Sequence, residues 1–340
     1  MGAGTARGGA CLLISGNVRK NMEFVVFAGV LLLLFIFMIV QELIQTKNQE
    51  KLFKKYLREN YGKEPPKEYS LERFARLGSY LERHKEEKQL DDITWNDLGM
   101  DEVFRRIDRT YSAAGEEYLY YTLRNISCGR EAMEHLEEVV NWLQEQEDIK
   151  VRIQLLMKRL GHLGKYSLYD YLDNLDYLGE RSNRKIVLGN LLYLPFLLLL
   201  FVQPAMGTIG IVLCMLWHIM TYFREKKVIE PYIISFAYVL RLIDVCEELE
   251  KQKIPVYRRE LDELREVLKS LRELRRGSYW VMAGNQGKIG GNPLDILADY
   301  LRMILHLDIF QFNRMLEKLR KKTGQVETML AITGYLDMAI

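Results

Sequence analysis

The chain has 340 residues, of which 49% are hydrophobic and 28% are charged, and its formal net charge is +2. This composition excludes a chain that is disordered throughout. Residues 44–185 carry 25 basic and 27 acidic side chains, and residues 224–340 carry 20 and 17. Neither region has the strong basic excess that is typical of an autonomous nucleic-acid-binding domain.

The N-terminal region contains a long uncharged run. Residues 1–21 are rich in Gly and Ala, and we interpret them as a tail that need not be native, with Met22 as the natural start. The run Phe24–Val40 approaches the ~20 residues of a spanning helix and exceeds the ~7–15 apolar residues of a signal peptide, and no small-residue cleavage site follows. We therefore predict an uncleaved transmembrane anchor at residues 22–43. Four lysines after it favour a cytoplasmic location for the next segment: Lys47, Lys51, Lys54 and Lys55.

Residues 44–185 read as a cytoplasmic, charged helical region. Ser112 is positioned to cap a helix whose first turn carries Glu116 and Glu117, where acidic side chains are favourable. The tyrosines that follow, including Tyr118 and Tyr121, could stack bases, but tyrosines at helical spacing usually fill a core, which is the interpretation we adopt.

Residues 186–223 contain no charged residue and are too long for a single helix. The stretch Gln203–Thr208, "QPAMGT", supplies a break, because Pro204 cannot continue a helix and Gly207 permits a turn. We predict a transmembrane hairpin, and a buried soluble hairpin is the alternative. Basic residues flank both ends and place both ends in the cytoplasm: Arg181, Arg184, Lys185, Arg224, Lys226 and Lys227.

Residues 224–340 read as a second cytoplasmic helical region. Within "YRRELDELREVLKSLRELRR", an apolar stripe is formed by Leu261, Leu264, Leu268 and Leu271. The opposite stripe is basic, and its members are candidates for facing nucleic-acid phosphates: Arg265, Lys269, Arg272 and Arg276. Acidic residues are interleaved with them, so a solvated helix face is the interpretation we favour.

The stretch "AGNQGKIGG", Ala283–Gly291, raises the question of a phosphate-binding loop. A P-loop has the pattern G-x-x-x-x-G-K-[ST]. Aligning Gly287 and Lys288 with this pattern puts Met282 at its first glycine and Ile289 at its Ser/Thr. Two of the four fixed positions fail, so we predict a flexible connection and no nucleotide site.

The sequence nominates no metal or catalytic residues. The cysteines form no CxxC pair, so we expect free thiols at Cys11, Cys128, Cys214 and Cys246. None of the histidines has a second His or a Cys at metal-ligand spacing: His84, His135, His162, His218 and His306. The predicted hairpin has no ionisable pair, only His218, which argues against an intramembrane enzyme.

Two regions resemble the core domain of the DNA mismatch repair MutS family. The first covers residues ~95–180. It includes Thr110-x-x-x-x-Gly115 followed by an apolar helix, and a later helix that ends in Val140-x-x-Leu143. The second covers residues ~290–340, where a Leu-Asp pair, Leu336 and Asp337, lies in the final helix. The resemblance implies a helical bundle and, C-terminal to residue 340, an ATPase domain that binds ATP and Mg²⁺.

The chain also departs from the family. Leu136 stands where the family has an Arg, and the only match to the Phe-x-Glu of mismatch-reading members is Phe223-Arg224-Glu225, at the edge of the hairpin. The hairpin interrupts the bundle where soluble members continue. The resemblance therefore implies a membrane-anchored MutS-like protein rather than a mismatch-repair clamp.

These observations predict an all-α fold in five parts: residues 1–21, 22–43, 44–185, 186–223 and 224–340. We expect a multi-pass cell-membrane protein without an enzymatic site or small-molecule substrate, which acts as an anchor, a lever and a module for dimerisation or for facing DNA. Its expected partners are the lipid bilayer, a second copy of the chain and nucleic acid. The alternative is a membrane scaffold whose long helices bind protein partners and have no nucleic-acid role.

Overall fold

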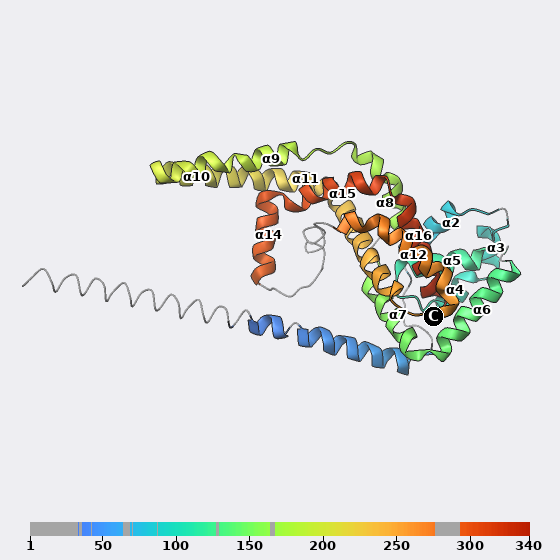
Figure 1. Cartoon of the computed structure of the whole chain (residues 1–340). Coiled ribbons are helices and arrows are strands. Elements are labelled where there is room, and N and C mark those ends of the chain that lie inside the picture. Colours follow the sequence, from blue (N-terminus) through green and yellow to red (C-terminus); the bar gives the residue numbers. More distant parts are fainter. Residues whose placement is uncertain are drawn as a thin grey trace, which may run out of the picture. The chain divides into compact units, whose positions relative to one another are not determined.

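The computed structural model (Figure 1) describes residues 33, 36–41, 43–63, 69, 71–86, 88–126, 129–163, 167–275 and 293–340. The chain divides into two compact units, residues 1–61 and 62–340. The prediction of a predominantly helical fold is confirmed, and no β-strand occurs in the ranges given above. An isolated antiparallel bridge joins Gln89 and Asn125.

In the first unit, residues 36–41 and 43–59 are helical. Pairs of opposite charge one turn apart support this helix; Lys54 Nζ, for example, lies 2.7 Å from Glu50 Oε1. The tail at residues 1–21 and most of the predicted anchor at residues 22–43 lie outside the described residues.

The elements of the second unit fall before and after the start of the apolar hairpin. The elements before the apolar hairpin are α2 (Leu71–Arg83), α3 (Asp92–Asp97), α4 (Met100–Ile107), α5 (Ala113–Arg124), α6 (Arg130–Glu145), α7 (Glu147–Leu160), α8 (Leu168–Asp173) and the 3₁₀ helix η1 (Asn174–Leu178). From the hairpin onward they are α9 (Arg184–Leu191), α10 (Tyr193–Val202), α11 (Pro204–Glu250), η2 (Pro255–Tyr257), α12 (Arg258–Leu271), η3 (Arg272–Arg275), α14 (Pro293–Leu305), α15 (Leu307–Arg320) and α16 (Thr323–Met338).

Helix α5 lies at the centre of the bundle, between α2 and α16. The tyrosines that the sequence assigned to the core do pack there; the ring centroids of Tyr80 and Tyr121 are 5.1 Å apart in an edge-to-face arrangement. The predicted apolar stripe of α12 is also confirmed, because all four of its leucines are buried: Leu261, Leu264, Leu268 and Leu271.

Helix α11 is continuous over 47 residues and belongs to two environments. Its N-terminal half pairs with α9 and α10, and its C-terminal half packs against α7, α12 and α16 (Figure 1). Exposed apolar side chains, such as Met220 and Phe223, give way from Ile233 onward to an almost unbroken buried series. The helix therefore runs straight through residue 223, where the sequence predicted the end of a separate hairpin.

The hairpin itself turns more tightly than the sequence indicates. Gln203 alone separates α10 from α11, and Pro204 occupies the first turn of α11, where its missing N–H costs nothing. Gly207 is helical and does not form the turn. It instead allows the helices to approach each other, because a Cβ there would lie 2.7 Å from the backbone nitrogen of Leu200. In the described part of the chain, two helical segments are long and apolar enough to cross a membrane, Arg184–Val202 and Pro204–Glu250.

Two glycines of α16 allow a matched test of the α5–α16 packing. A Cβ on Gly334 would lie 2.6 Å from the carbonyl oxygen of Ala114 in α5, whereas Gly324 has nothing within 4 Å. Both substitutions to Ala improve helix propensity by up to about 1 kcal/mol. We expect Gly324→Ala to keep or raise the free energy of unfolding and Gly334→Ala to lower it, because the backbone of α5 must move.

The measurement is urea unfolding of the detergent-solubilised chain, followed by circular dichroism. Equal midpoints for the two variants would contradict the close approach of α16 to α5.

Candidate functional site: a buried polar cluster around α5

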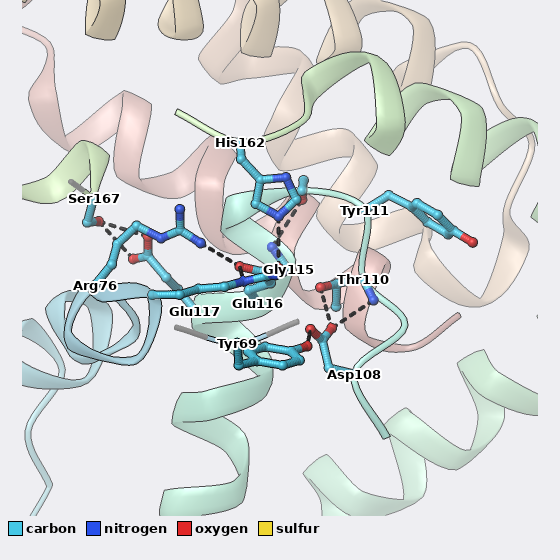
Figure 2. Close-up of polar contacts among 12 residues, drawn as sticks. Tyr69, Arg76, Asp108, Thr110, Tyr111, Gly115, Glu116, Glu117, His162 and Ser167 are labelled. Carbon is cyan, nitrogen blue, oxygen red and sulfur yellow. Dashed lines mark hydrogen bonds and ion pairs between the residues drawn. The ribbon is translucent and has the colours of Figure 1, made fainter. Parts of the chain in front are cut away.

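The segment before α5 is folded by its own short polar side chains. Ser112 takes an extended backbone conformation at the N-cap, and its Oγ accepts a hydrogen bond from the Gly115 amide at 3.1 Å, as its sequence position predicts. Asp108 accepts hydrogen bonds from the Thr110 amide at 2.9 Å and from the Thr110 hydroxyl at 2.6 Å. The Tyr69 hydroxyl also donates to Asp108 (Figure 2). These contacts fix the residue at which α5 begins.

Asp337 of α16 binds the same segment from the other end of the chain. Its Oδ2 accepts hydrogen bonds from the Ser112 amide at 2.8 Å and the Ser112 hydroxyl at 2.6 Å, and from the Tyr111 amide at 3.1 Å. The carboxylate is buried, and the free N–H groups and dipole at the N-terminus of α5 compensate for its desolvation. Gly115 makes room for it, because a Cβ at that position would collide with the carboxylate.

Glu116, in the first turn of α5, is a buried carboxylate with three cationic or polar partners. Arg76 Nη2 lies 2.6 Å from its Oε2, His162 Nε2 lies 2.8 Å from its Oε1, and Arg73 forms a further ion pair with it. Burial alone would raise the pKa of this carboxyl, but the hydrogen bonds and charges of His162 and Arg73 outweigh burial and lower the pKa to about 2. Glu116 is therefore ionised at all physiological pH values.

Glu117, the adjacent residue, is also buried, but its pKa is raised rather than lowered. Ser167 Oγ lies 2.8 Å from its Oε1 and 2.9 Å from its Oε2 (Figure 2). Burial raises the pKa of Glu117 to about 8, against the lowering influence of Ser167 and Arg76. Two neighbouring carboxyl groups thus differ in protonation at pH 7, because only Glu116 forms close ion pairs.

The cluster joins parts of the bundle that are far apart in the sequence. Residues of α2, α16 and the segments before α5 and α8 all contact the first turn of α5 (Figure 2). The cluster is packed in the interior, and none of its residues lines the cavity of about 720 Å³ that lies elsewhere in the unit. The arrangement can hold these helices in register and can release a proton at Glu117. We interpret it as a structural joint.

Sequence reasoning does not find this cluster, because acidic residues near a helix N-terminus are usually solvated. The signals present were the Ser112 cap, the glycine three residues later and the Leu-Asp pair at residues 336–337. A second pairing that the sequence missed is that of His218 and His306, whose Nδ1 atoms lie 3.3 Å apart although 88 positions separate the residues. Among the described residues, no group of three or more His, Cys, Asp or Glu side chains is arranged to hold a metal ion.

Three of the four nucleic-acid-facing candidates, Arg265, Lys269 and Arg272, are exposed on α12 and η3, and two of them are engaged by acids. Arg265 lies 2.6 Å from Glu250 and 2.8 Å from Asp262, and Lys269 lies 2.6 Å from Glu266. Arg272 is exposed in η3. Arg276 and the glycine-rich stretch at residues 277–292 lie outside the described residues. The cysteines that can be described, Cys214 and Cys246, are free and buried as expected.

Comparison with protein-family models, with curated proteins and with solved structures finds no match. The fold itself therefore defines the class of protein: a helical bundle that carries two helices long and apolar enough to cross a membrane.

The two adjacent carboxyl groups give opposite predictions for the same isosteric substitution. Glu116→Gln should lower the free energy of unfolding at pH 7 by about 3–5 kcal/mol, because it leaves Arg73 and Arg76 without their buried counter-charge. The pKa of Glu116 is depressed, so its stabilisation is present above its unfolded value of 4.5 and is lost as the pH falls toward 2.

Glu117→Gln should instead raise the free energy of unfolding at pH 9 by at least about 1 kcal/mol. The folded protein holds a proton on Glu117 between pH 4.5 and about 8, so wild-type stability falls as the pH rises through that window, and the variant should lose this dependence. Urea titrations from pH 2 to pH 9 measure both effects. Parallel pH profiles for the two variants would contradict the assigned environments.

Proposed function

We propose that this chain is a membrane-anchored, non-catalytic helical module of a MutS-like ATPase, in which α11 transmits movement between the bilayer and the bundle. The observation that carries the proposal is the continuity of α11, because one helix presents exposed apolar side chains in its first half and core side chains in its second. A continuous helix links the two regions, so a displacement of the bundle is passed to the hairpin through α11, with Pro231 as its most easily bent point.

The dimensions and surface of the hairpin support a place in the bilayer. Segment Arg184–Val202 has 19 residues, which corresponds to a length of about 28 Å, close to the ~30 Å of a hydrocarbon core. Only 6% of its most apolar window is buried inside the protein, so the helix does not resemble the core helix of a soluble bundle. The side chain of Phe201 near the tip is 90% exposed, which water disfavours and lipid accommodates.

The contact between α5 and α16 supports the MutS-like part of the proposal. The resemblance rests on residues ~95–180 and ~290–340, which the hairpin and α11 separate in the sequence. In the bundle, Asp337 from the second region binds the backbone at Tyr111 and Ser112 in the first. A core domain with an inserted hairpin requires the two regions to form one packed body in this way.

The exposed face of α12 does not favour direct contact with DNA by this module, as in the alternative of a membrane scaffold without a nucleic-acid role. The acidic neighbours of Arg265 and Lys269 offset their charge, and exposed ion pairs of this kind leave little net potential to attract phosphates. In the proposal, nucleotide and Mg²⁺ belong to the ATPase domain of such a protein, and this chain provides the anchor and the lever.

The first prediction concerns topology. In a chain whose native cysteines are replaced, Ala205→Cys at the hairpin tip should react with a membrane-impermeant maleimide added outside intact cells, and Ser182→Cys should not. Both positions are exposed in the protein, so burial does not account for a difference between them. After detergent lysis both should react equally. Labelling of Ser182→Cys alone in intact cells would contradict the proposed orientation.

The second prediction concerns the basic stripe. Replacing Arg265, Lys269, Arg272 and Arg276 together with Gln should leave duplex-DNA affinity unchanged, because the paired acids already offset the charge. A helix that followed phosphates would instead lose affinity, and its salt slope would flatten by roughly one unit per lost contact. Fluorescence anisotropy over a salt series measures both quantities, and a salt-dependent affinity that collapses in the quadruple variant would favour a DNA-binding module.

A further inference from the structure

The base of the hairpin contains a cavity of about 720 Å³ that the proposed lever function does not use. Its walls come from η1, the segment between η1 and α9, α9 and the residue after it, the middle of α11, and α15 with the residue before it. Its lining includes the apolar side chains Leu188, Leu192 and Trp217 and the cationic side chains Arg181, Lys185 and Arg224. A volume of this size accommodates a ligand much larger than a simple ion.

The cations around the cavity are only partly compensated. Arg181 Nη2 is paired with Glu225 Oε2 at 2.7 Å, while its Nη1 is buried and has no hydrogen-bond partner among the described residues. Lys185 and Arg224 are exposed and form no ion pair within the described part of the chain. Glu180 and the paired Glu225 are the only carboxylates among the lining residues. The cavity mouth therefore favours an anionic group.

Other polar atoms of the lining also lack partners. Within the part of the chain that the structure describes, His218 Nε2 and Asn313 Oδ1 are buried without a hydrogen bond. Buried polar atoms are normally satisfied, and these two atoms and Arg181 Nη1 all belong to residues that line this cavity. His306, beside His218, is neutral near pH 7, because burial and then His218 lower its pKa to about 4. His306 therefore contributes hydrogen bonds rather than charge.

We propose that this cavity binds the phosphate headgroup of an anionic phospholipid, with an acyl chain along the wall of Leu188, Leu192 and Trp217. The inference rests on the proposed function, because it places the hairpin in a bilayer. The cavity then lies at the level where lipid headgroups meet basic side chains, and Trp is favoured at the same level. An apolar wall beside unpaired cations fits an amphiphile better than a free phosphate, which would leave that wall in contact with water.

The test uses Trp217 as a reporter within the lining. The full chain is reconstituted in phosphatidylcholine vesicles that contain an equal fraction of either brominated phosphatidylglycerol or brominated phosphatidylcholine, since bromine quenches nearby tryptophan. The signal of Trp217 is the difference between the chain and its Trp217→Phe variant. We expect stronger quenching by the anionic lipid, and a preference that falls about thirtyfold in the double variant Lys185→Gln/Arg224→Gln, at about 1 kcal/mol per cation.

A matched control removes the same charges outside the cavity. Arg184 and Lys227 are exposed at the same end of the hairpin and do not line the cavity, so Arg184→Gln/Lys227→Gln should keep most of the preference. An equal loss in both double variants, or equal quenching by the two lipids, would overturn the proposal. Inorganic phosphate should reduce the anionic-lipid preference no more than sodium chloride does at the same ionic strength. If phosphate abolished the preference, the cavity would be assigned to a soluble phosphate instead.

Resistance of the reconstituted chain to alkaline carbonate extraction is measured on the same samples. An extracted chain would overturn the proposed membrane function together with this inference. A chain that resists extraction but shows no anionic preference would overturn the lipid site alone.

Discussion

The carboxylate of Asp337 at the N-terminus of α5 is the interaction on which the bundle depends. It joins residues 225 positions apart, so much of the chain between them is confined once it forms. Its burial is tolerated only because the backbone donors of Tyr111 and Ser112 replace water. The approach also needs Gly115 and Gly334, where a side chain would collide with Asp337 or with the backbone of α5. The buried carboxylate thus requires a glycine at residue 115, and the close packing of α16 on α5 requires one at residue 334.

The charge arrangement around α5 follows from this central position. A helix held between α2 and α16 cannot expose its first turn, so Glu116 and Glu117 are buried along with it. Glu116 is stabilised by arginines from α2 and by His162, whereas Glu117 has a hydroxyl partner and keeps a proton. Replacing a member of such a network costs more than the pair itself contributes, because the remaining charges stay buried.

The sequence predicts the features that depend on local pattern. The leucine stripe of α12, the Ser112 cap and the break near Gln203 all follow from spacing or from the chemistry of one residue. The burial of Glu116 does not, because it depends on which helices surround α5, and nothing local to residues 112–117 encodes that. The pairing of His218 with His306 is hidden for the same reason. Gly207 was assigned to the turn because sequence does not distinguish a glycine that bends the chain from one that lets two helices approach.

The position of Pro231 bears on how a lever of this kind could work. A proline inside a helix leaves the carbonyl four residues before it without its usual donor, here the carbonyl of Lys227, and bending is cheapest there. Pro231 lies just after Val228, the last α11 residue that lines the cavity, and before Ile233, where core packing becomes almost continuous. The weakest point of α11 therefore separates its membrane half from its bundle half. Packing fixes the C-terminal half of α11, and the cavity contacts hold its N-terminal half. A ligand in the cavity therefore shifts the bend of α11 at Pro231 only if it binds one bend angle more tightly than another.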